Sequence, residues 1–261
     1  MMRIASVFTE KKHAALIAFI TVGYPTLEAT LEAVPLLEKC GVDMVELGIP
    51  FSDPLADGIT IQQASFEALQ NGITPAACLD AARFIRKKSN MPLIFMTYYN
   101  PVLSYGQELF CADSSRAGID GLIIPDLPLE EAGALEESTL NHNLDLIYLL
   151  APNSSEARIR EVADRSRGFI YLISVTGVTG IRENAPLGLN EFTSKVKKHT
   201  DKPLCMGFGI STPEQAAHVS KSVDGVIVGS SIVHIMGTQK QWKPPLSHFI
   251  RSLKKAIQTA K

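Results

Sequence analysis

Short apolar runs alternate with longer amphipathic stretches along the whole chain. The runs are rich in isoleucine, valine, leucine and phenylalanine, and a glycine, proline, asparagine, aspartate or serine follows each one within a few residues. Runs that are apolar throughout are typical of strands buried on both faces, as in a parallel sheet that helices cover. The pattern predicts eight strands, over Leu16–Thr21, Met44–Gly48, Pro92–Thr97, Gly121–Ile124, Asp145–Leu150, Phe169–Ile173, Pro203–Met206 and Gly225–Val228.

The segments between these runs carry helix signals. Thr26 can cap a helix that Gly41 ends. The connection after the second strand is long enough for an extra helix over Thr60–Leu69 as well as a regular one over Thr74–Lys87. Eight units in 261 residues leave about 33 residues for each strand and helix, which is the size of a unit in a (β/α)8 barrel. We therefore expect an α/β fold, a single (β/α)8 TIM barrel over residues 1–261 with an extra helix after strand two.

The charge balance narrows the function classes. With 25 lysine and arginine residues against 27 aspartate and glutamate residues, the net charge is −2, so no surplus of cations exists to neutralise a nucleic-acid backbone. The four cysteines lie far apart without a Cys-x-x-Cys pair, which indicates reduced thiols. No signal peptide and no run of about 20 apolar residues is visible. The sequence thus predicts a cytoplasmic chain with no nucleic-acid or membrane partner.

Glycine-rich turns follow the last two predicted strands. Gly207–Ser211 follows strand seven, Gly229–Ser231 follows strand eight, and each opens a helical stretch. In a (β/α)8 barrel the catalytic groups sit at the carboxyl ends of the strands, and the last two loops often bind phosphate. Glycine lets backbone N–H groups approach an anion, and a helix N-terminus carries about half a positive charge. The pair predicts a phosphate seat without lysine or arginine, although either loop alone fits an ordinary tight turn.

Two carboxyl groups belong to the second strand and the loop after it. If Val45 and Leu47 face the helices, alternation points Glu46 into the barrel, where burial favours the protonated form and suits a general acid or base. A structural glutamate paired with a cation is the alternative, but no lysine or arginine lies in a predicted strand interior. Asp57, in the turn-rich loop that follows, is either a turn residue or a second carboxyl placed across the pocket.

The loop after the sixth strand, residues 174–188, is longer than most loops that join a strand to a helix. It contains Gly177, Gly180 and Gly188 and few apolar residues, a composition that fits an active-site lid or a mobile surface loop. Two common chemistries are disfavoured. No lysine lies at the carboxyl end of a predicted strand, where a Schiff base would form, and the histidines lack metal-ligand spacing.

The segment Glu46–Gly58 resembles the signature of the tryptophan synthase α subunit family. Thr176–Gly180, Gly207–Ser211 and Val228–Ser230 are similar to that family's lid and phosphate loops, in the same order along the chain. One departure is Ile59, which stands where the family usually has proline. Because proline restricts the unfolded chain, its absence is expected to leave the preceding loop less ordered.

The resemblance implies a carbon–carbon lyase of tryptophan biosynthesis, which cleaves indole-3-glycerol phosphate to indole and glyceraldehyde 3-phosphate in a retro-aldol reaction. It makes Glu46 the general acid and base, and Asp57 the acceptor of a hydrogen bond from the indole N–H. The other residues that it assigns are those of the phosphate seat (Gly180, Gly209, Gly229 and Ser230), the lid (Thr179) and the indole pocket (Phe19, Tyr171 and Phe208). The three aromatic side chains fit the barrel core almost as well.

The resemblance also implies a partner. The family's β subunit carries pyridoxal phosphate (PLP) and receives the indole directly in an α2β2 complex, so we expect this chain to need no cofactor or metal. Loops after strands two to four make that contact in the family, and here they contain Asp53, Pro54, Tyr98, Asn100, Asp126 and Pro128. Tyrosines at a strand end fit pocket walls equally well. Two other functions stay open: a mainly regulatory subunit of the β subunit with weak lyase activity, and a barrel isomerase acting on another sugar phosphate.

Overall fold

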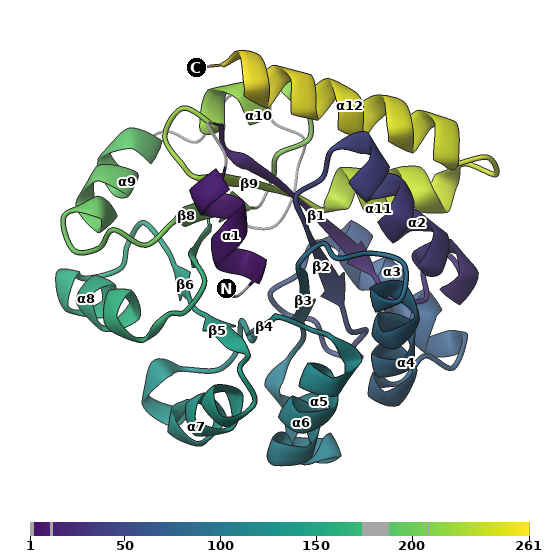
Figure 1. Cartoon of the computed structure of the whole chain (residues 1–261), viewed down its shortest axis with the longest axis horizontal. Helices are drawn as coiled ribbons and strands as arrows, with labels where there is room; N and C mark the ends of the chain where they lie inside the picture. The colour runs from purple at the N-terminus through teal and green to yellow at the C-terminus, as the bar shows by residue number, and fades with distance from the viewer. Residues whose placement is uncertain (1–2, 11–12, 174–187, 208, 261) are drawn as a thin grey trace.

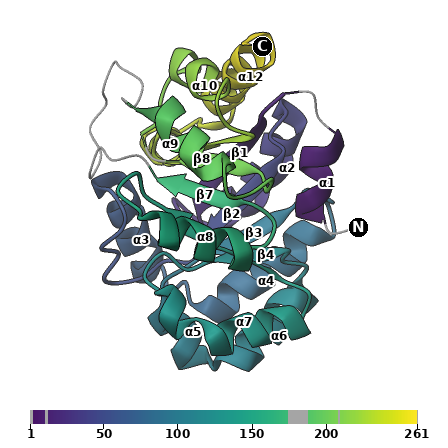
Figure 2. The ribbon, with the colours of Figure 1, turned by 90° about the vertical axis from the view of Figure 1, so that its left-hand side faces the viewer.

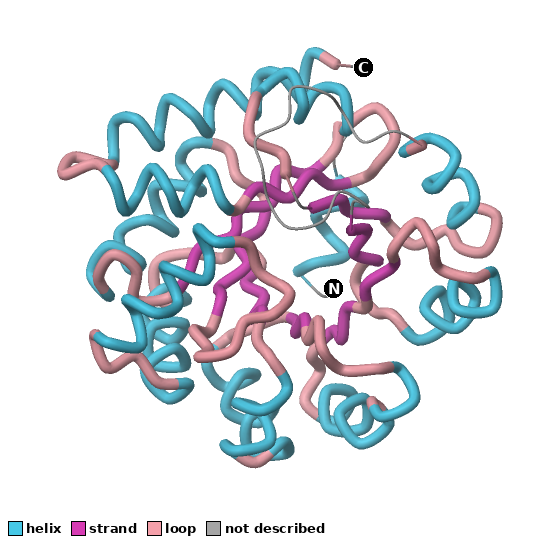
Figure 3. The backbone as a smooth tube through the Cα atoms, turned by 180° about the vertical axis from the view of Figure 1, so that it is seen from behind, coloured by secondary structure: helices cyan, strands magenta, loops and turns pink. Residues whose placement is uncertain are grey.

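Parallel strands form a barrel with helices packed around its outside (Figures 1 and 3). The computed structural model describes residues 3–10, 13–173, 188–207 and 209–260. The predicted barrel is confirmed, and each of the eight predicted strands is present within two residues of its expected bounds. The strands are β1 (Ala15–Thr21), β2 (Met44–Gly48), β3 (Leu93–Met96), β4 (Gly121–Ile123), β5 (Asp145–Ile147), β6 (Leu149–Leu150), β7 (Ile170–Ile173), β8 (Leu204–Gly207) and β9 (Gly225–Val228).

The fifth predicted strand is divided in two. The order of strands in the sheet is β5-β4-β3-β2-β1-β9-β8-β7-β6, and the two end members are consecutive in the chain, with only Tyr148 between them. The backbone N–H of Tyr171 donates to the carbonyl of Tyr148 across 3.0 Å. The stretch therefore pairs with β4 through its first half and with β7 through its second, and it brings the two ends of the sheet together.

Helices follow the strands along the chain, and the predicted extra helix after the second strand is confirmed as α3. Thr26 accepts a hydrogen bond from the N–H of Ala29 at 3.1 Å, and Gly41 ends the same helix with a φ of 101°, as the sequence predicts. The helices are α1 (Arg3–Glu10), α2 (Leu27–Cys40), α3 (Ile59–Gln70), α4 (Pro75–Arg86), α5 (Tyr99–Tyr105), α6 (Gln107–Ala117), the 3-10 turn η1 (Leu129–Glu131), α7 (Gly133–Asn141), α8 (Glu156–Arg165), α9 (Leu189–Lys197), α10 (Pro213–Val219), α11 (Ser230–Thr238) and α12 (Lys243–Thr259).

The amino-terminal helix α1 lies across one end of the barrel (Figure 1). Its Ile4 is fully buried among residues of the barrel interior, and the ring of Phe8 meets that of Phe169 edge-on with 6.1 Å between centroids. In the side view, α1 and α3 lie at opposite ends of the barrel (Figure 2). The sequence patterns did not predict α1. It covers the amino-terminal end of the strands, so the carboxyl ends of the strands lie at the opposite end of the barrel.

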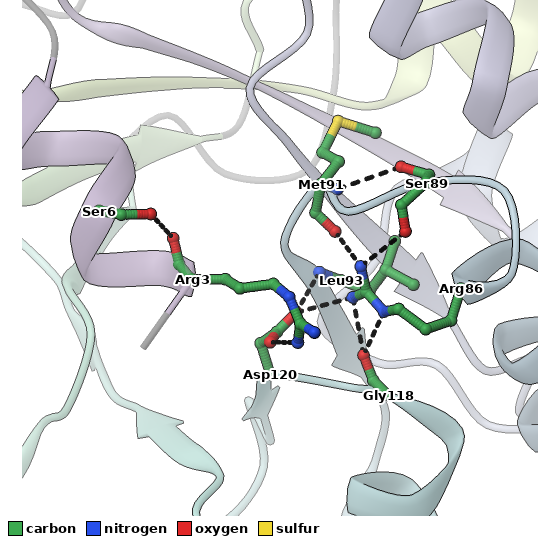
Figure 4. A network of polar contacts seen from close by, with 8 residues as sticks. All are labelled: Arg3, Ser6, Arg86, Ser89, Met91, Leu93, Gly118 and Asp120. Carbon is green, nitrogen blue, oxygen red and sulfur yellow. Dashed lines mark hydrogen bonds and ion pairs between the residues drawn. The ribbon is translucent and has the colours of Figure 1, made fainter. Parts of the chain in front are cut away.

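A polar network ties α1 to the barrel (Figure 4). Asp120 accepts from Arg3 at 2.8 Å, from Arg86 at 2.9 Å and from the backbone N–H of Leu93 at 2.9 Å. Arg86 also donates to the carbonyl of Gly118 at 2.7 Å. A partly buried carboxylate that is shared by two guanidinium groups and a backbone N–H is well satisfied, so the network holds α1, α4 and the start of β3 in one arrangement.

Two layers of apolar side chains make up the core. Alternate strand residues point inward, where Ile17, Met44, Ile94 and Ile227 fill the barrel. Their neighbours in the strands point outward and pack under the helices, as Val45 and Leu47 of β2 do. Among the described residues, no helix is long and apolar enough to cross a membrane.

Candidate active site

A cavity of about 530 Å³ opens at the carboxyl end of the strands. Strand residues form its floor and walls, and the turns after β8 and β9 form one side. The first turn of α3 and the later helices α11 and α12 complete it. The lining residues that the sequence singled out are Phe19, Glu46, Asp57, Tyr171, Gly209, Gly229 and Ser230. The structure therefore gathers around one space the two carboxyl groups, two of the aromatic residues and the described residues of the predicted phosphate seat.

Glu46 lies at the bottom of this cavity. Alternation along β2, with Val45 and Leu47 turned to the helices, points Glu46 inward between its neighbours Phe19 of β1 and Ile94 of β3. Its side chain is fully buried, and neither carboxyl oxygen has a hydrogen-bond partner in the described part of the chain. Burial raises the pKa of Glu46 to about 8, because an unpaired carboxylate loses the hydration it has in water. The group therefore holds its proton at neutral pH.

Asp57 faces the same cavity from the loop after β2, in a different environment. Burial raises its pKa to about 6, and a hydrogen bond from the Tyr98 hydroxyl opposes that rise. The hydroxyl donates to Oδ2 of Asp57 at 3.0 Å and accepts from the N–H of Ala56 at 2.9 Å, while the Tyr98 ring stacks on Phe51. At neutral pH, Asp57 is ionised and Glu46 is protonated, so one cavity holds a carboxylate and a carboxylic acid.

The turns after β8 and β9 lead into helices whose N-termini differ in side-chain capping. Thr212 and Gln215 form a reciprocal capping box at the N-terminus of α10. Oε1 of Gln215 also accepts from the N–H of Ser211 at 2.8 Å. In contrast, α11 begins after Gly229 without a side-chain cap. The first N–H groups of an uncapped helix are the ordinary site for an anion. The start of α11 is therefore the uncapped helix end beside the cavity, and Gly209 lines the same space.

Glycines make room for two large rings in the cavity wall. A Cβ atom on Gly48 would lie 2.5 Å from Cζ of Phe19, and one on Gly207 would lie 2.1 Å from the hydroxyl oxygen of Tyr171. Both rings therefore pack against bare backbone. Tyr171 is buried, and its pKa is raised well above the ordinary value by burial first and then by the negative charges of Glu46 and Asp57. The cavity thus has large aromatic rings in its wall beside the polar residues of α11, since a Cβ atom on Gly229 would lie 3.2 Å from Cβ of Phe19.

Several residues singled out in the sequence lie outside the cavity or outside the described chain. Thr179, Gly180 and Phe208 lie outside the described residues. The residues expected at a partner interface follow β2, β3 and β4 at the rim: Asp53, Asn100, Asp126 and Pro128 are exposed and Pro54 is half-buried. Tyr98 is only 6% exposed. Its hydroxyl bonds Ala56 and Asp57, and its ring stacks on Phe51. Tyr98 therefore supports the loop that carries Asp57.

Other lining residues were missed in the sequence. Met96 and Ile227 occupy inward positions near the ends of β3 and β9, and alternation in their runs was a usable signal for them. His234 lies one turn after Ser230 along α11, and Phe249 comes from α12. No local pattern separates these last residues from an ordinary helix surface, since only the packing of α11 and α12 brings them to the cavity.

Comparison with known proteins gives one consistent result. A model of the family "Tryptophan synthase alpha chain" matches residues 6–258. The chain is 51% identical to the tryptophan synthase alpha chain of Dehalococcoides mccartyi over 257 residues, which cover 98% of this chain and 100% of that one. It is 47% identical to that of Geobacter sulfurreducens, with 98% and 99% covered.

Solved structures agree with this result. The tryptophan synthase subunit alpha of Legionella pneumophila superposes with a TM-score of 0.90 at 35% identity, covering 99% of both chains. A chain of the Mycobacterium tuberculosis tryptophan synthase superposes with a TM-score of 0.90 at 36% identity, covering 98% of each. The chain therefore belongs to the tryptophan synthase alpha chain family, the carbon–carbon lyases that release indole from indole-3-glycerol phosphate in tryptophan biosynthesis.

Proposed function

We propose that Glu46 and Asp57 carry out the cleavage of indole-3-glycerol phosphate to indole and glyceraldehyde 3-phosphate in this chain. The observation that carries the assignment is the buried carboxyl of Glu46, which has no described partner and shares a cavity with the uncapped start of α11. A buried carboxyl without a partner destabilises a fold, so its presence calls for a chemical reason. A docking surface has no use for such a group, which favours a lyase over a mainly regulatory subunit.

The chemistry needs one proton donor and one stabilising carboxylate. Glu46 gives its proton to C3 of the indole, which leaves a positive charge on the ring nitrogen, and the Asp57 carboxylate accepts a hydrogen bond from that N–H. The Glu46 carboxylate then takes the hydroxyl proton of the adjoining glycerol carbon. As the aldehyde forms, the bond between C3 and that carbon breaks, and its electron pair returns to the indole and cancels the charge. Glu46 ends protonated, so the cycle is closed.

The remaining roles belong to other residues that line the cavity. Backbone N–H groups at Gly229 and Ser230, with Gly209 opposite, hold the phosphate. Phe19 and Tyr171 flank the indole, since flat apolar walls suit an aromatic ring. The family resemblance adds Gly180 to the phosphate seat, Phe208 to the indole pocket and Thr179 to the lid.

We propose further that indole leaves this chain for a β subunit that carries PLP in an α2β2 complex, while this chain works as one catalytic domain without a cofactor of its own. The exposed rim residues Asp53, Asn100, Asp126 and Pro128 would contact that subunit together with Pro54. Tyr98 would act through the loop it supports. Leu55 in the same loop is 90% exposed, which fits a surface that a partner covers.

The pH dependence of indole release tests the two-carboxyl mechanism. The reaction needs Asp57 ionised and Glu46 protonated, so kcat/KM should rise as pH increases through about 6 and fall as it increases through about 8. The measurement is the initial rate of indole formation from indole-3-glycerol phosphate between pH 5 and 9, in the presence of the β subunit. A chain that forms no indole contradicts the proposed function, and a rate that does not decline above pH 8 contradicts the role of Glu46 as the acid.

A variant of Tyr98 tests the rise of kcat/KM near pH 6, the acid limb, separately from its fall near pH 8, the alkaline limb. Tyr98→Phe removes the hydrogen bond that lowers the pKa of Asp57, so that pKa rises and the carboxylate is lost at a higher pH. We expect the acid limb to move upward while the alkaline limb stays in place, with kcat/KM at pH 6 reduced by about tenfold. Tyr99→Phe is the matched control, because that hydroxyl bonds Gln107. An unchanged acid limb in Tyr98→Phe would show that this contact does not tune Asp57.

A further inference from the structure

One side chain of the cavity has no role in the reaction described above. His234 lies on α11, one turn after Ser230, and lines the same cavity as Gly209, Gly229 and Ser230. Its ring makes no hydrogen bond or ion pair with the part of the chain that the structure describes. Its backbone carbonyl accepts a hydrogen bond from the Thr238 hydroxyl, which does not involve the ring. The imidazole is therefore available to a ligand.

Helix geometry directs this ring toward the phosphate seat. Residues four apart lie on one face of a helix with about 5–6 Å between their Cβ atoms. Side chains also lean toward the helix N-terminus, and His234 is exposed on the cavity side of α11, so from this position an imidazole reaches the space over the first turn. That turn holds Ser230 and Ser231, both of which line the cavity, and its N–H groups are the ones without a side-chain cap.

The charges around the cavity make a side-chain donor useful at this place. Among its described lining residues, none is a lysine or an arginine, and the other ionisable groups are Glu46, Asp57 and Tyr171. A phosphate dianion would otherwise rely on backbone N–H groups and hydroxyls in a cavity that also contains a carboxylate. An imidazole donates a hydrogen bond from a ring N–H in its neutral form and from either ring nitrogen when protonated.

We propose that His234 contacts the phosphate of the substrate and is a binding residue of this site, in addition to the backbone seat. The inference rests on the proposed function only for the identity of the phosphate ester. Two groups would then bind the phosphate: the backbone N–H groups at the start of α11, and the His234 ring on the outer side of the anion. His234 takes no part in proton transfer to the indole, so it should affect binding far more than turnover.

Binding of two separate probes tests the proposal. We expect His234→Leu, which has no hydrogen-bond donor in its side chain, to weaken glycerol 3-phosphate binding by about tenfold, as for the loss of a hydrogen bond to a charged group, and to leave indole binding unchanged. His234→Lys, which keeps a donor, should restore most of the affinity for glycerol 3-phosphate. Both dissociation constants come from calorimetry on the full chain, and kinetics with indole-3-glycerol phosphate should show a raised KM with kcat nearly unchanged.

The control is His218→Leu, which changes an exposed histidine of α10 that does not line the cavity. Equal affinity for glycerol 3-phosphate in His234→Leu and wild type overturns the proposal. Weakened binding of both probes also overturns it, since that would indicate a structural role for His234 in α11. Calorimetry needs no turnover, so a chain without lyase activity would fail the proposed function and still give a clear answer about His234.

Discussion

Glu46→Gln lowers kcat for indole release by about 10³- to 10⁴-fold, the size expected for removal of a general acid–base group, while the chain keeps its fold. The glutamine side chain has nearly the same shape as the buried acid, so it fills the same space below the cavity. Its amide neither gives a proton to C3 of the indole nor takes one from the glycerol hydroxyl. Both halves of the reaction are therefore blocked by one substitution.

Steady-state assays of indole formation, with and without the β subunit, measure this loss, and circular dichroism checks the fold. Glu137→Gln, at an exposed position of α7, is the matched control and should be fully active. A rate for Glu46→Gln close to that of the wild type would refute the mechanism. Activation of the β subunit by Glu46→Gln should be unchanged, because the rim of the barrel is unaltered, so the two activities separate lyase from regulator.

The inward position of Glu46 could be predicted from the sequence because strand geometry has a period of two. Once Val45 and Leu47 are assigned to the helix layer, the residue between them has no other direction to take. The place of the two glycine turns beside the cavity was predictable in a similar way, since they follow the last two strands of the pattern. Only the structure distinguishes the two turns, because the capping of α10 by Gln215 depends on a side chain that folds back onto Ser211.

Other features depend on contacts between segments far apart in the chain. Asp57 acquires its environment from the hydroxyl of Tyr98, which lies 41 residues later in the sequence, and no local pattern contains that pair. The helix α1 is short, and its apolar face is buried only because it packs on the end of the barrel. His234 reaches the cavity only through the placement of α11. These are the positions at which tertiary packing, and not local propensity, decides the outcome.

The same substitution that removes activity should stabilise the chain. In the unfolded chain Glu46 titrates near its ordinary pKa of 4.5, whereas in the folded chain burial raises that pKa to about 8. Below pH 4.5 both states are protonated and the fold loses nothing. As pH increases from there toward 8, the unfolded state gains from ionisation and the folded state does not, so stability falls by about 1.4 kcal/mol for each pH unit. Above pH 8 the loss levels off.

Glutamine carries no such penalty, because it is neutral in both states at every pH in this interval. We therefore expect Glu46→Gln and the wild type to have the same free energy of unfolding near pH 4. At pH 7 the free energy of unfolding of Glu46→Gln should be higher by about 3 kcal/mol. Such a gain is typical when a residue that activity requires destabilises the fold. Urea unfolding of the full chain without ligand, followed from pH 4 to 8, measures the difference. For the control Glu137→Gln, the difference in free energy of unfolding from the wild type should not grow with pH. A difference for Glu46→Gln that does not grow with pH would mean that the buried carboxyl ionises as freely in the folded chain as in water, and Glu46 would then have no proton to give at neutral pH.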